Sequence, residues 1–103
     1  ADGPDHPQTT NVINDLGVCL AATKEYGEGI AYLERALANR RRAKDPAVAE
    51  AAFALAKVLW DVPRERARAL ALAEEARSLW QADAAERSIA KVDAWLGEHP
   101  LGR

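Results

Sequence analysis

Two stretches of this sequence repeat each other at a distance of 40 residues, and this internal repeat constrains the fold more than any other feature. The segment 29–36, GIAYLERA, aligns with 69–76, ALALAEEA, with small or apolar residues at the first, fifth and eighth places of both. At an offset of 39 residues, a second match pairs Leu16, Gly17 and Leu20 with Leu55, Ala56 and Leu59. The one-residue difference falls in the expected loop at Pro63, where an insertion costs little. Self-similarity at this period is typical of stacked helix pairs.

Apolar residues recur at spacings of three and four along five segments, which predicts five helices and no strand. The breaks between the segments are short, so neighbouring helices must run antiparallel. We therefore expect a single all-α domain over residues 8–99, made of two antiparallel helix pairs and a C-terminal capping helix. Its expected parts are an extended lead-in at 1–7, repeat one at about 9–44, repeat two at about 46–80, the capping helix at about 84–97 and a tail at 100–103.

The helical spacing also predicts which residues pack. On the first helix, Ile13, Leu16 and Leu20 form the expected apolar stripe. Because Gly17 and Ala36 are small, we expect the first two helices to cross closely at these residues. On the last helix, Ile89, Val92 and Leu96 are expected to pack on the fourth helix and to leave Lys91 and Glu98 in water.

The first repeat resembles the tetratricopeptide repeat. The matching positions are Leu16, Gly17, Leu20, Tyr26, Gly29, Leu33 and Ala36. The segment 3–7, GPDHP, followed by 14–16, NDL, is similar to the kinesin-light-chain-like subtype of this repeat. The resemblance implies a right-handed α–α superhelix whose concave groove binds a protein or peptide, with the first helix of each pair lining the groove.

The second half of the chain also resembles the repeat tails of large bacterial serine/threonine protein kinases. The similar segments are 53–60, 66–73 and 92–96, the last of them just before His99. This resemblance implies that a kinase domain precedes these repeats in a longer protein. The chain begins at Ala1 and contains no methionine, which also predicts a piece of a longer protein. No glycine-rich phosphate loop or catalytic-loop signature occurs, so we expect no kinase activity in this piece.

Composition narrows the function classes. The formal net charge of −2 predicts no general affinity for nucleic acid or an anionic membrane, and no apolar run approaches the length of a membrane span. Cys19 is the only cysteine, which favours a reducing, cytoplasmic compartment. We expect Cys19 to be a small buried residue rather than a nucleophile, because no histidine is near it in sequence.

No constellation for catalysis, metal binding or a cofactor is expected. His6 and His99 lie near opposite ends of the chain, whereas a metal needs its ligands grouped on one face. Four carboxylates between residues 74 and 86 are expected to form solvated faces with two arginines at helical spacing rather than catalytic pairs. These carboxylates are Glu74, Glu75, Asp83 and Glu86, with Arg77 and Arg87 as the expected partners.

The candidate binding residues lie on the first and third helices. Following the groove-facing spacing that the resemblance implies, they are Asn11, Asn14, Val18, Phe53, Lys57 and Trp60. We expect the asparagines to hold a ligand backbone, Phe53 to provide exposed apolar area and Lys57 to favour an acidic group. Whether Trp60 lines the groove or packs against an adjoining helix stays open.

The sequence therefore predicts a protein-interaction module that is no enzyme. One alternative is a regulatory or dimerising tail of a bacterial serine/threonine kinase. The other is a weak nucleic-acid binder that uses the arginines of 40–44 and 64–68. The sequence identifies neither the partner nor the oligomeric state.

Overall fold

A computed structural model describes residues 7–99, and this part of the chain is all-α. Its elements are α1 (Pro7–Ala22), α2 (Tyr26–Arg42), α3 (Val48–Trp60), the short 3₁₀ helix η1 (Pro63–Glu65), α4 (Arg66–Ala82) and α5 (Glu86–Glu98). Within the described residues, the prediction of five α-helices and no strand is confirmed. The expected lead-in at 1–7 and tail at 100–103 lie outside the described residues, except that Pro7 is the first residue of α1.

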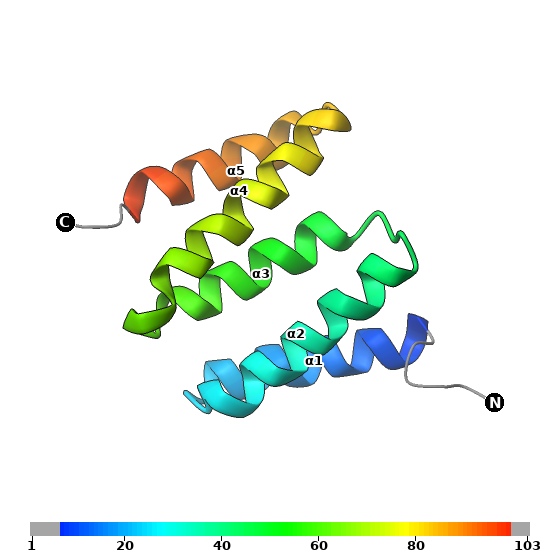
Figure 1. Cartoon of the computed structure of the whole chain (residues 1–103), viewed down its shortest axis with the longest axis vertical. Helices are drawn as coiled ribbons and strands as arrows, with labels where there is room; N and C mark the ends of the chain where they lie inside the picture. The colour runs from blue at the N-terminus through cyan, green and yellow to red at the C-terminus, as the bar shows by residue number, and fades with distance from the viewer. Residues whose placement is uncertain (1–6, 100–103) are drawn as a thin grey trace.

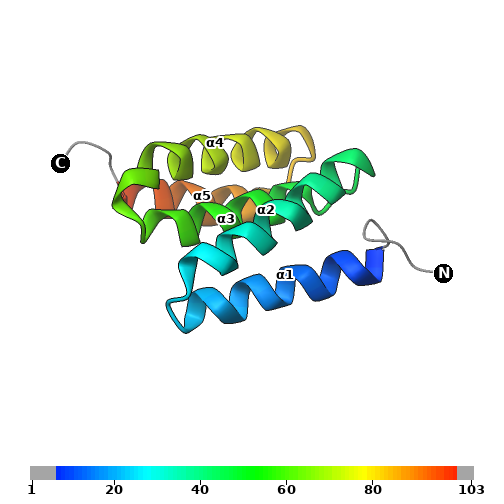
Figure 2. The same ribbon diagram turned by 60° about the horizontal axis from the view of Figure 1, so that its bottom comes forward.

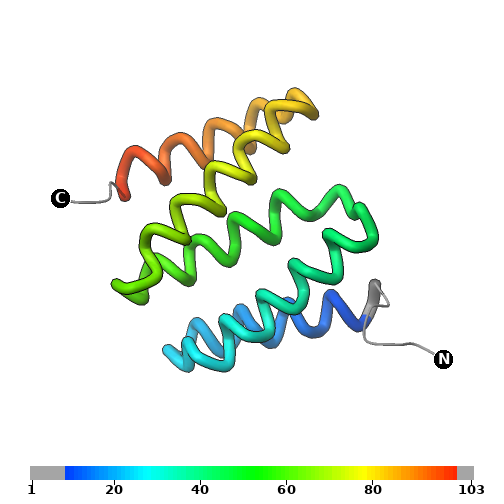
Figure 3. The backbone as a smooth tube through the Cα atoms, in the orientation of Figure 1, coloured from blue at the N-terminus to red at the C-terminus, as the bar shows by residue number. Residues whose placement is uncertain are grey.

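Successive helices pack side by side along the chain (Figure 1, Figure 3). The helix α1 packs on α2, α2 on α3, α3 on α4, and α4 on α5. The Cα atoms extend over 47 × 33 × 17 Å, and the 17 Å thickness fits two layers of helices. Figure 2 shows α3 between α2 and α4, so α3 occupies the centre of the molecule.

The central helix α3 is buried on most of its circumference. Its buried residues are Ala49, Ala51, Ala52, Phe53, Leu55, Ala56 and Leu59. Leu33 and Leu37 of α2 pack on one side, and Val92 of α5 completes the core on the other. A helix that is apolar all round must be covered on several sides to be stable in water.

Residues that are aligned by the internal repeat of the sequence are also buried in equivalent ways. Gly29 and Ala69 are both buried, and so are Leu33 and Ala73 at the fifth place of the aligned segments. At the eighth place, Ala36 and Ala76 are both fully buried. The helices α2 and α4 therefore use equivalent faces to contact their neighbours.

Three helices end in the same turn. After α1, α2 and α4 the chain passes through a residue with positive φ, namely Lys24 (66°), Lys44 (53°) and Ala84 (54°). The next residue then donates its backbone N–H to a carbonyl five residues back, as Ala85 does to Trp80 at 2.9 Å. This Schellman-type ending satisfies carbonyls that the helix leaves unpaired. The end of α3 differs, because Pro63 follows Val62 and forces it into an extended conformation (φ −109°, ψ 104°).

Replacing Ala84 by glycine should stabilise the protein. A left-handed residue with a Cβ atom costs about 1–2 kcal/mol, and glycine relieves this cost at an entropic penalty of about 0.5–1 kcal/mol. We expect Ala84→Gly to raise Tm in a thermal melt followed by circular dichroism. The matched control is Ala71→Gly at an exposed position within α4, which should lower stability by about 1 kcal/mol. A lower Tm for both variants would contradict the proposed strain at Ala84.

Two glycines allow α1 and α2 to approach each other closely. A Cβ atom added to Gly17 would lie 2.6 Å from Leu33 Cγ and 2.9 Å from the carbonyl oxygen of Gly29. A Cβ atom on Gly29 would lie 2.9 Å from the carbonyl oxygen of Gly17. The prediction of a close crossing at Gly17 was right, but its nearest neighbours are Gly29 and Leu33 rather than Ala36.

Further along the same pair of helices, Asn39 Nδ2 donates a hydrogen bond of 3.3 Å to Thr10 Oγ1, and both side chains are buried.

Adding one methyl group at the crossing should therefore destabilise the protein. In Gly17→Ala the new Cβ atom meets backbone as well as side chain, so the helices must separate, at a cost of about 1–3 kcal/mol. The measurement is chemical unfolding in urea. Gly27→Ala is the control, because a Cβ atom there meets nothing within 4 Å, and its stability should stay equal or rise slightly. Equal stability of Gly17→Ala and wild type would show that the crossing is not tight.

The expected stripe of α1 was partly wrong. Ile13 and Gly17 are buried against α2, but Leu16 is 45% exposed and Cys19 is also exposed. Consecutive helix residues point about 100° apart. The small Gly17 therefore takes the contact with α2, and the adjacent Leu16 is turned away from it. Apolar character alone favoured Leu16, and Cys19 is not the buried residue that was expected.

The last helix packs as predicted. Val92 is fully buried, Ile89 and Leu96 are partly buried against the core, and Lys91 and Glu98 are exposed. Among the described helices, none is both long enough and apolar enough to cross a membrane.

Candidate functional site

Two adjoining hollows lie along the side of α3 that no other described helix covers. We call the first the aromatic hollow; its volume is about 260 Å³ and it is lined by Glu50, Phe53, Ala54, Lys57, Trp80, Ser88 and Lys91. The second, the polar hollow, has a volume of about 250 Å³ and is lined by Asn14, Arg40, Ala47, Glu50, Ala51 and Ala54. Because Glu50 and Ala54 belong to both, the two hollows form one continuous surface, which we call the groove.

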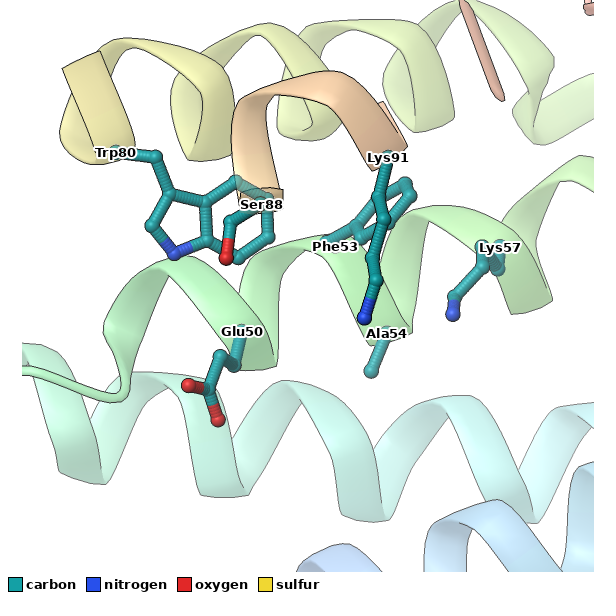
Figure 4. A pocket seen from close by; sticks show the side chains of 7 residues that line it. All are labelled: Glu50, Phe53, Ala54, Lys57, Trp80, Ser88 and Lys91. Carbon is teal, nitrogen blue, oxygen red and sulfur yellow. The ribbon is translucent and has the colours of Figure 1, made fainter. Parts of the chain in front are cut away.

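The groove is built mainly from three helices that are not consecutive in the chain. The central helix α3 contributes Glu50, Ala54 and Lys57, which lie one or two turns apart on a single stripe. Figure 4 shows Ser88 and Lys91 reaching the aromatic hollow from α5, with Trp80 entering from the end of α4. Asn14 of α1 lines the opposite end, in the polar hollow.

The two hollows are equivalent under the 40-residue repeat. Arg40 at the end of α2 lines the polar hollow, and Trp80, 40 residues later at the end of α4, lines the aromatic hollow. Ala51 of α3 and Lys91 of α5 are a second such pair. The repeated fold therefore makes one hollow between α1 and α3 and another between α3 and α5, and the side chains give each a different character.

Phe53 forms the floor of the aromatic hollow. Its ring is edge-on to those of Trp80 and Trp95, with centroids 5.8 Å away in both cases, and the residue is only 9% exposed. The expectation of an exposed anchor at Phe53 was wrong, because Trp95 of α5 and Trp80 of α4 both pack against its ring. Such edge-to-face pairs add stability beyond the burial of area.

Truncating the Phe53 side chain should lower the stability of the fold, and not only the affinity for a ligand. We expect Phe53→Ala to cost about 3–5 kcal/mol, since it removes a buried ring from between two tryptophans. Thermal melting and tryptophan fluorescence should both report the loss. Lys57→Ala, which removes an exposed side chain from the same helix, should change Tm little. A small effect of Phe53→Ala on Tm would mean that the aromatic contacts are dispensable.

The rim of the aromatic hollow carries unpaired charge. The ammonium of Lys57 lies 4.7 Å from the centroid of the Phe53 ring, a cation–π contact. Lys91 is exposed on the facing helix α5, and Glu50 is exposed between the two hollows. Among the described residues, none of these three side chains has an oppositely charged partner within 4.0 Å.

The two predicted asparagines contact an arginine of α2. Arg40 Nη2 donates to Asn11 Oδ1 at 2.9 Å, and Arg40 Nη1 donates to Asn14 Oδ1 at 3.2 Å. Asn14 lines the polar hollow, whereas Asn11 reaches the groove only through Arg40. Their carbonyl oxygens are thus already engaged within the protein.

Val18 and Trp60 line neither hollow. Val18 is 46% exposed on α1. Trp60 packs at the end of α3, with its ring centroid 5.8 Å from that of Trp95 and 5.1 Å from that of His99. Arg66 lies 4.8 Å from the same ring and donates its Nε proton to the Trp60 carbonyl at 2.9 Å. The open question is settled in favour of packing.

Sequence reasoning missed several groove residues: four lie on α5 or near the ends of α2 and α4, and two lie on α3 beside the predicted positions. They are Arg40, Glu50, Ala54, Trp80, Ser88 and Lys91. The repeat contained a usable signal: if α5 is aligned with α3 at an offset of 40 residues, Lys91 falls at the position of Ala51 and faces the groove.

Three of the remaining arginines pair with carboxylates of other helices. Arg41 of α2 pairs with Glu75 of α4 at 2.6 Å, and Arg68 of α4 pairs with Glu34 of α2. Arg77 of α4 donates to Asp93 of α5, and this hydrogen bond and the charge of Asp93 raise the pKa of Arg77. Glu75 and Arg77 are partly exposed to solvent, as expected, but each pairs with a residue of a neighbouring helix.

Comparisons with protein-family models, curated proteins and solved structures found no significant match to this chain. The resemblances to the tetratricopeptide repeat and to kinase repeat tails therefore stay predictions. Within residues 7–99, no three histidine, cysteine or carboxylate side chains come together in a way that could hold a metal ion.

Proposed function

We propose that this chain is a protein-interaction module that binds an extended segment of a partner protein in the groove. The observation that carries this proposal is the pair of adjoining, repeat-equivalent hollows along the uncovered stripe of α3. Each hollow, at about 250–260 Å³, is smaller than the 300–1,000 Å³ typical of small-molecule sites. Two small hollows in a row suit successive side chains of a polypeptide.

The chemistry of the groove supports the same proposal. Its floor is aromatic at Phe53 and Trp80, and its rim carries the charges of Lys57, Lys91 and Glu50. An apolar centre with a polar rim is the arrangement found at protein interfaces. The floor is held by the packing of Phe53 against two tryptophans, so it is formed before a ligand arrives and little ordering entropy is lost there on binding.

A superhelix of tetratricopeptide type fits this proposal, because the first helices of successive pairs would then be α1, α3 and α5, the helices that contribute most of the groove. The module would serve equally well in the cytoplasmic repeat tail of a kinase. Nucleic-acid binding is less favoured, since Arg41 and Arg68 are paired with carboxylates and Arg66 is held against Trp60.

The groove can be tested by blocking it. Ala54 belongs to both hollows and is partly exposed, so Ala54→Tyr should fill the groove without disturbing the core. We expect a random-peptide display selection on the wild-type protein to yield peptides that do not bind Ala54→Tyr. Ala38→Tyr, at an exposed position of α2, is the matched control and should bind them normally.

Amide chemical shifts would locate the binding site of these peptides independently. Shifts should concentrate at Glu50, Ala54, Ser88 and Lys91 and should spare the exposed side of α2 around Tyr32 and Arg35. Peptides that bind wild type and Ala54→Tyr equally, or shifts centred on α2, would place the binding surface elsewhere.

A further inference from the structure

The guanidinium of Arg40 is held in the polar hollow by two asparagines of another helix. Arg40 extends from α2 to α1, where Asn11 and Asn14 each accept one hydrogen bond from a different terminal nitrogen. Two contacts from adjacent turns of α1 fix both the position and the plane of the guanidinium. Arg40 is half-buried and lines the hollow together with Glu50.

This arrangement leaves donors of Arg40 available. A guanidinium has five N–H groups, and the two asparagines use two of them. Among the described residues, no carboxylate lies within 4.0 Å of Arg40, in contrast to Arg41 next to it in the chain, which pairs with Glu75. An arginine that is held in one orientation and has free N–H groups is suited to donate hydrogen bonds to a carboxylate.

The other end of the groove repeats this positive character in a different form. Lys57 of α3 and Lys91 of α5 flank the aromatic hollow from facing helices, and neither has a carboxylate partner within the described part of the chain. The ring of Phe53 lies beneath the Lys57 ammonium at 4.7 Å. A carboxylate between these lysines would lie directly beside an apolar subsite.

Glu50 separates the two positive regions. It lines both hollows and is exposed, so its carboxylate faces the middle of any segment that occupies the groove. A ligand acid at this middle position would be repelled, whereas a backbone N–H or a basic side chain would be attracted. The charges along the groove therefore run positive, negative, positive.

We infer that the groove selects a partner segment with two carboxylates, one bound by Arg40 and one by Lys57 and Lys91, and with an apolar side chain in the aromatic hollow. The residue that faces Glu50 is uncharged or basic. Asn11 and Asn14 act as positioning residues, because they hold Arg40 rather than the ligand. This inference rests on the proposed function and specifies the partner's chemistry.

The test uses capped synthetic peptides, so that no terminal carboxylate contributes. In each peptide two glutamates flank one leucine at several spacings, and matched peptides carry glutamine at one or both positions. We expect the best glutamate peptide to bind the full chain at least about tenfold more tightly than its double-glutamine counterpart, with the difference shrinking at high salt. Fluorescence anisotropy of labelled peptides gives the affinities.

Charge reversal makes the test specific. The double variant Lys57→Glu with Lys91→Glu changes only exposed side chains. This variant should lose affinity for the glutamate peptide. It should gain affinity for a peptide in which lysine replaces the glutamate that faces residues 57 and 91. Arg40→Gln should weaken binding of the glutamate peptide about tenfold. Asn11→Ala alone should weaken binding of the glutamate peptide but not of the glutamine peptide. When Asn11→Ala is added to Arg40→Gln, it should have no further effect, because Asn11 acts only through Arg40.

The outcomes separate this inference from the proposed function. Equal affinity for glutamate and glutamine peptides, or no gain of lysine peptides by the reversed variant, would overturn the inferred ligand chemistry. Display-selected peptides that still map to Ala54 and Ser88 would leave the groove itself in place. Failure of those peptides to map to the groove would overturn both.

Discussion

The burial of α3 is the constraint on which the rest of the structure depends. Seven of its thirteen residues are buried, and the helix packs on α2 and α4 at the same time. Because α3 is apolar over most of its circumference, the neighbouring helices must surround it, and the exposed Glu50 and Lys57 lie with Ala54 on the stripe that no other described helix covers. The groove is thus the part of the central helix that the fold leaves free.

The charged residues are used in two ways. Glu34 and Arg41 lie seven residues apart on α2 and pair with Arg68 and Glu75, seven residues apart on α4. The two pairs match a single parallel register of α2 and α4, since a shift by one turn would break both. Exposed ion pairs of this kind add little free energy, so they accompany this register rather than impose it. In the groove, by contrast, Lys57, Lys91 and Glu50 have no such partner among the described residues.

The period of the sequence predicted much of the fold but less of the site. The offset of 40 residues placed Leu33 with Ala73 and Ala36 with Ala76, and all four are buried as equivalents. Small residues were harder to interpret: Gly17 takes the contact with α2 that the apolar pattern assigned to Leu16, because a close helix crossing requires the absence of a side chain.

The site was harder to predict because it depends on which side chains meet from distant helices. Asn14, Phe53 and Lys57 do line the groove, but helical spacing on α3 could not reveal that Trp80 and Trp95 pack against Phe53 and bury it. It also could not reveal that Arg40 reaches Asn11 and Asn14 from the next helix. Periodicity gives the face of one helix, whereas these contacts depend on the angles and distances between helices.

The position of Phe53 has a consequence for how such a module can diversify. The ring is at once the floor of the aromatic hollow and a contact of the buried Trp80 and the partly buried Trp95, so substitutions that reshape the floor also threaten folding. The rim residues Lys57, Ser88 and Lys91 line the hollow without also packing in the core. New ligand preferences would therefore arise by substitution of rim residues while the floor residue is kept. A library randomised at the rim would retain more folded members than a library randomised at the floor.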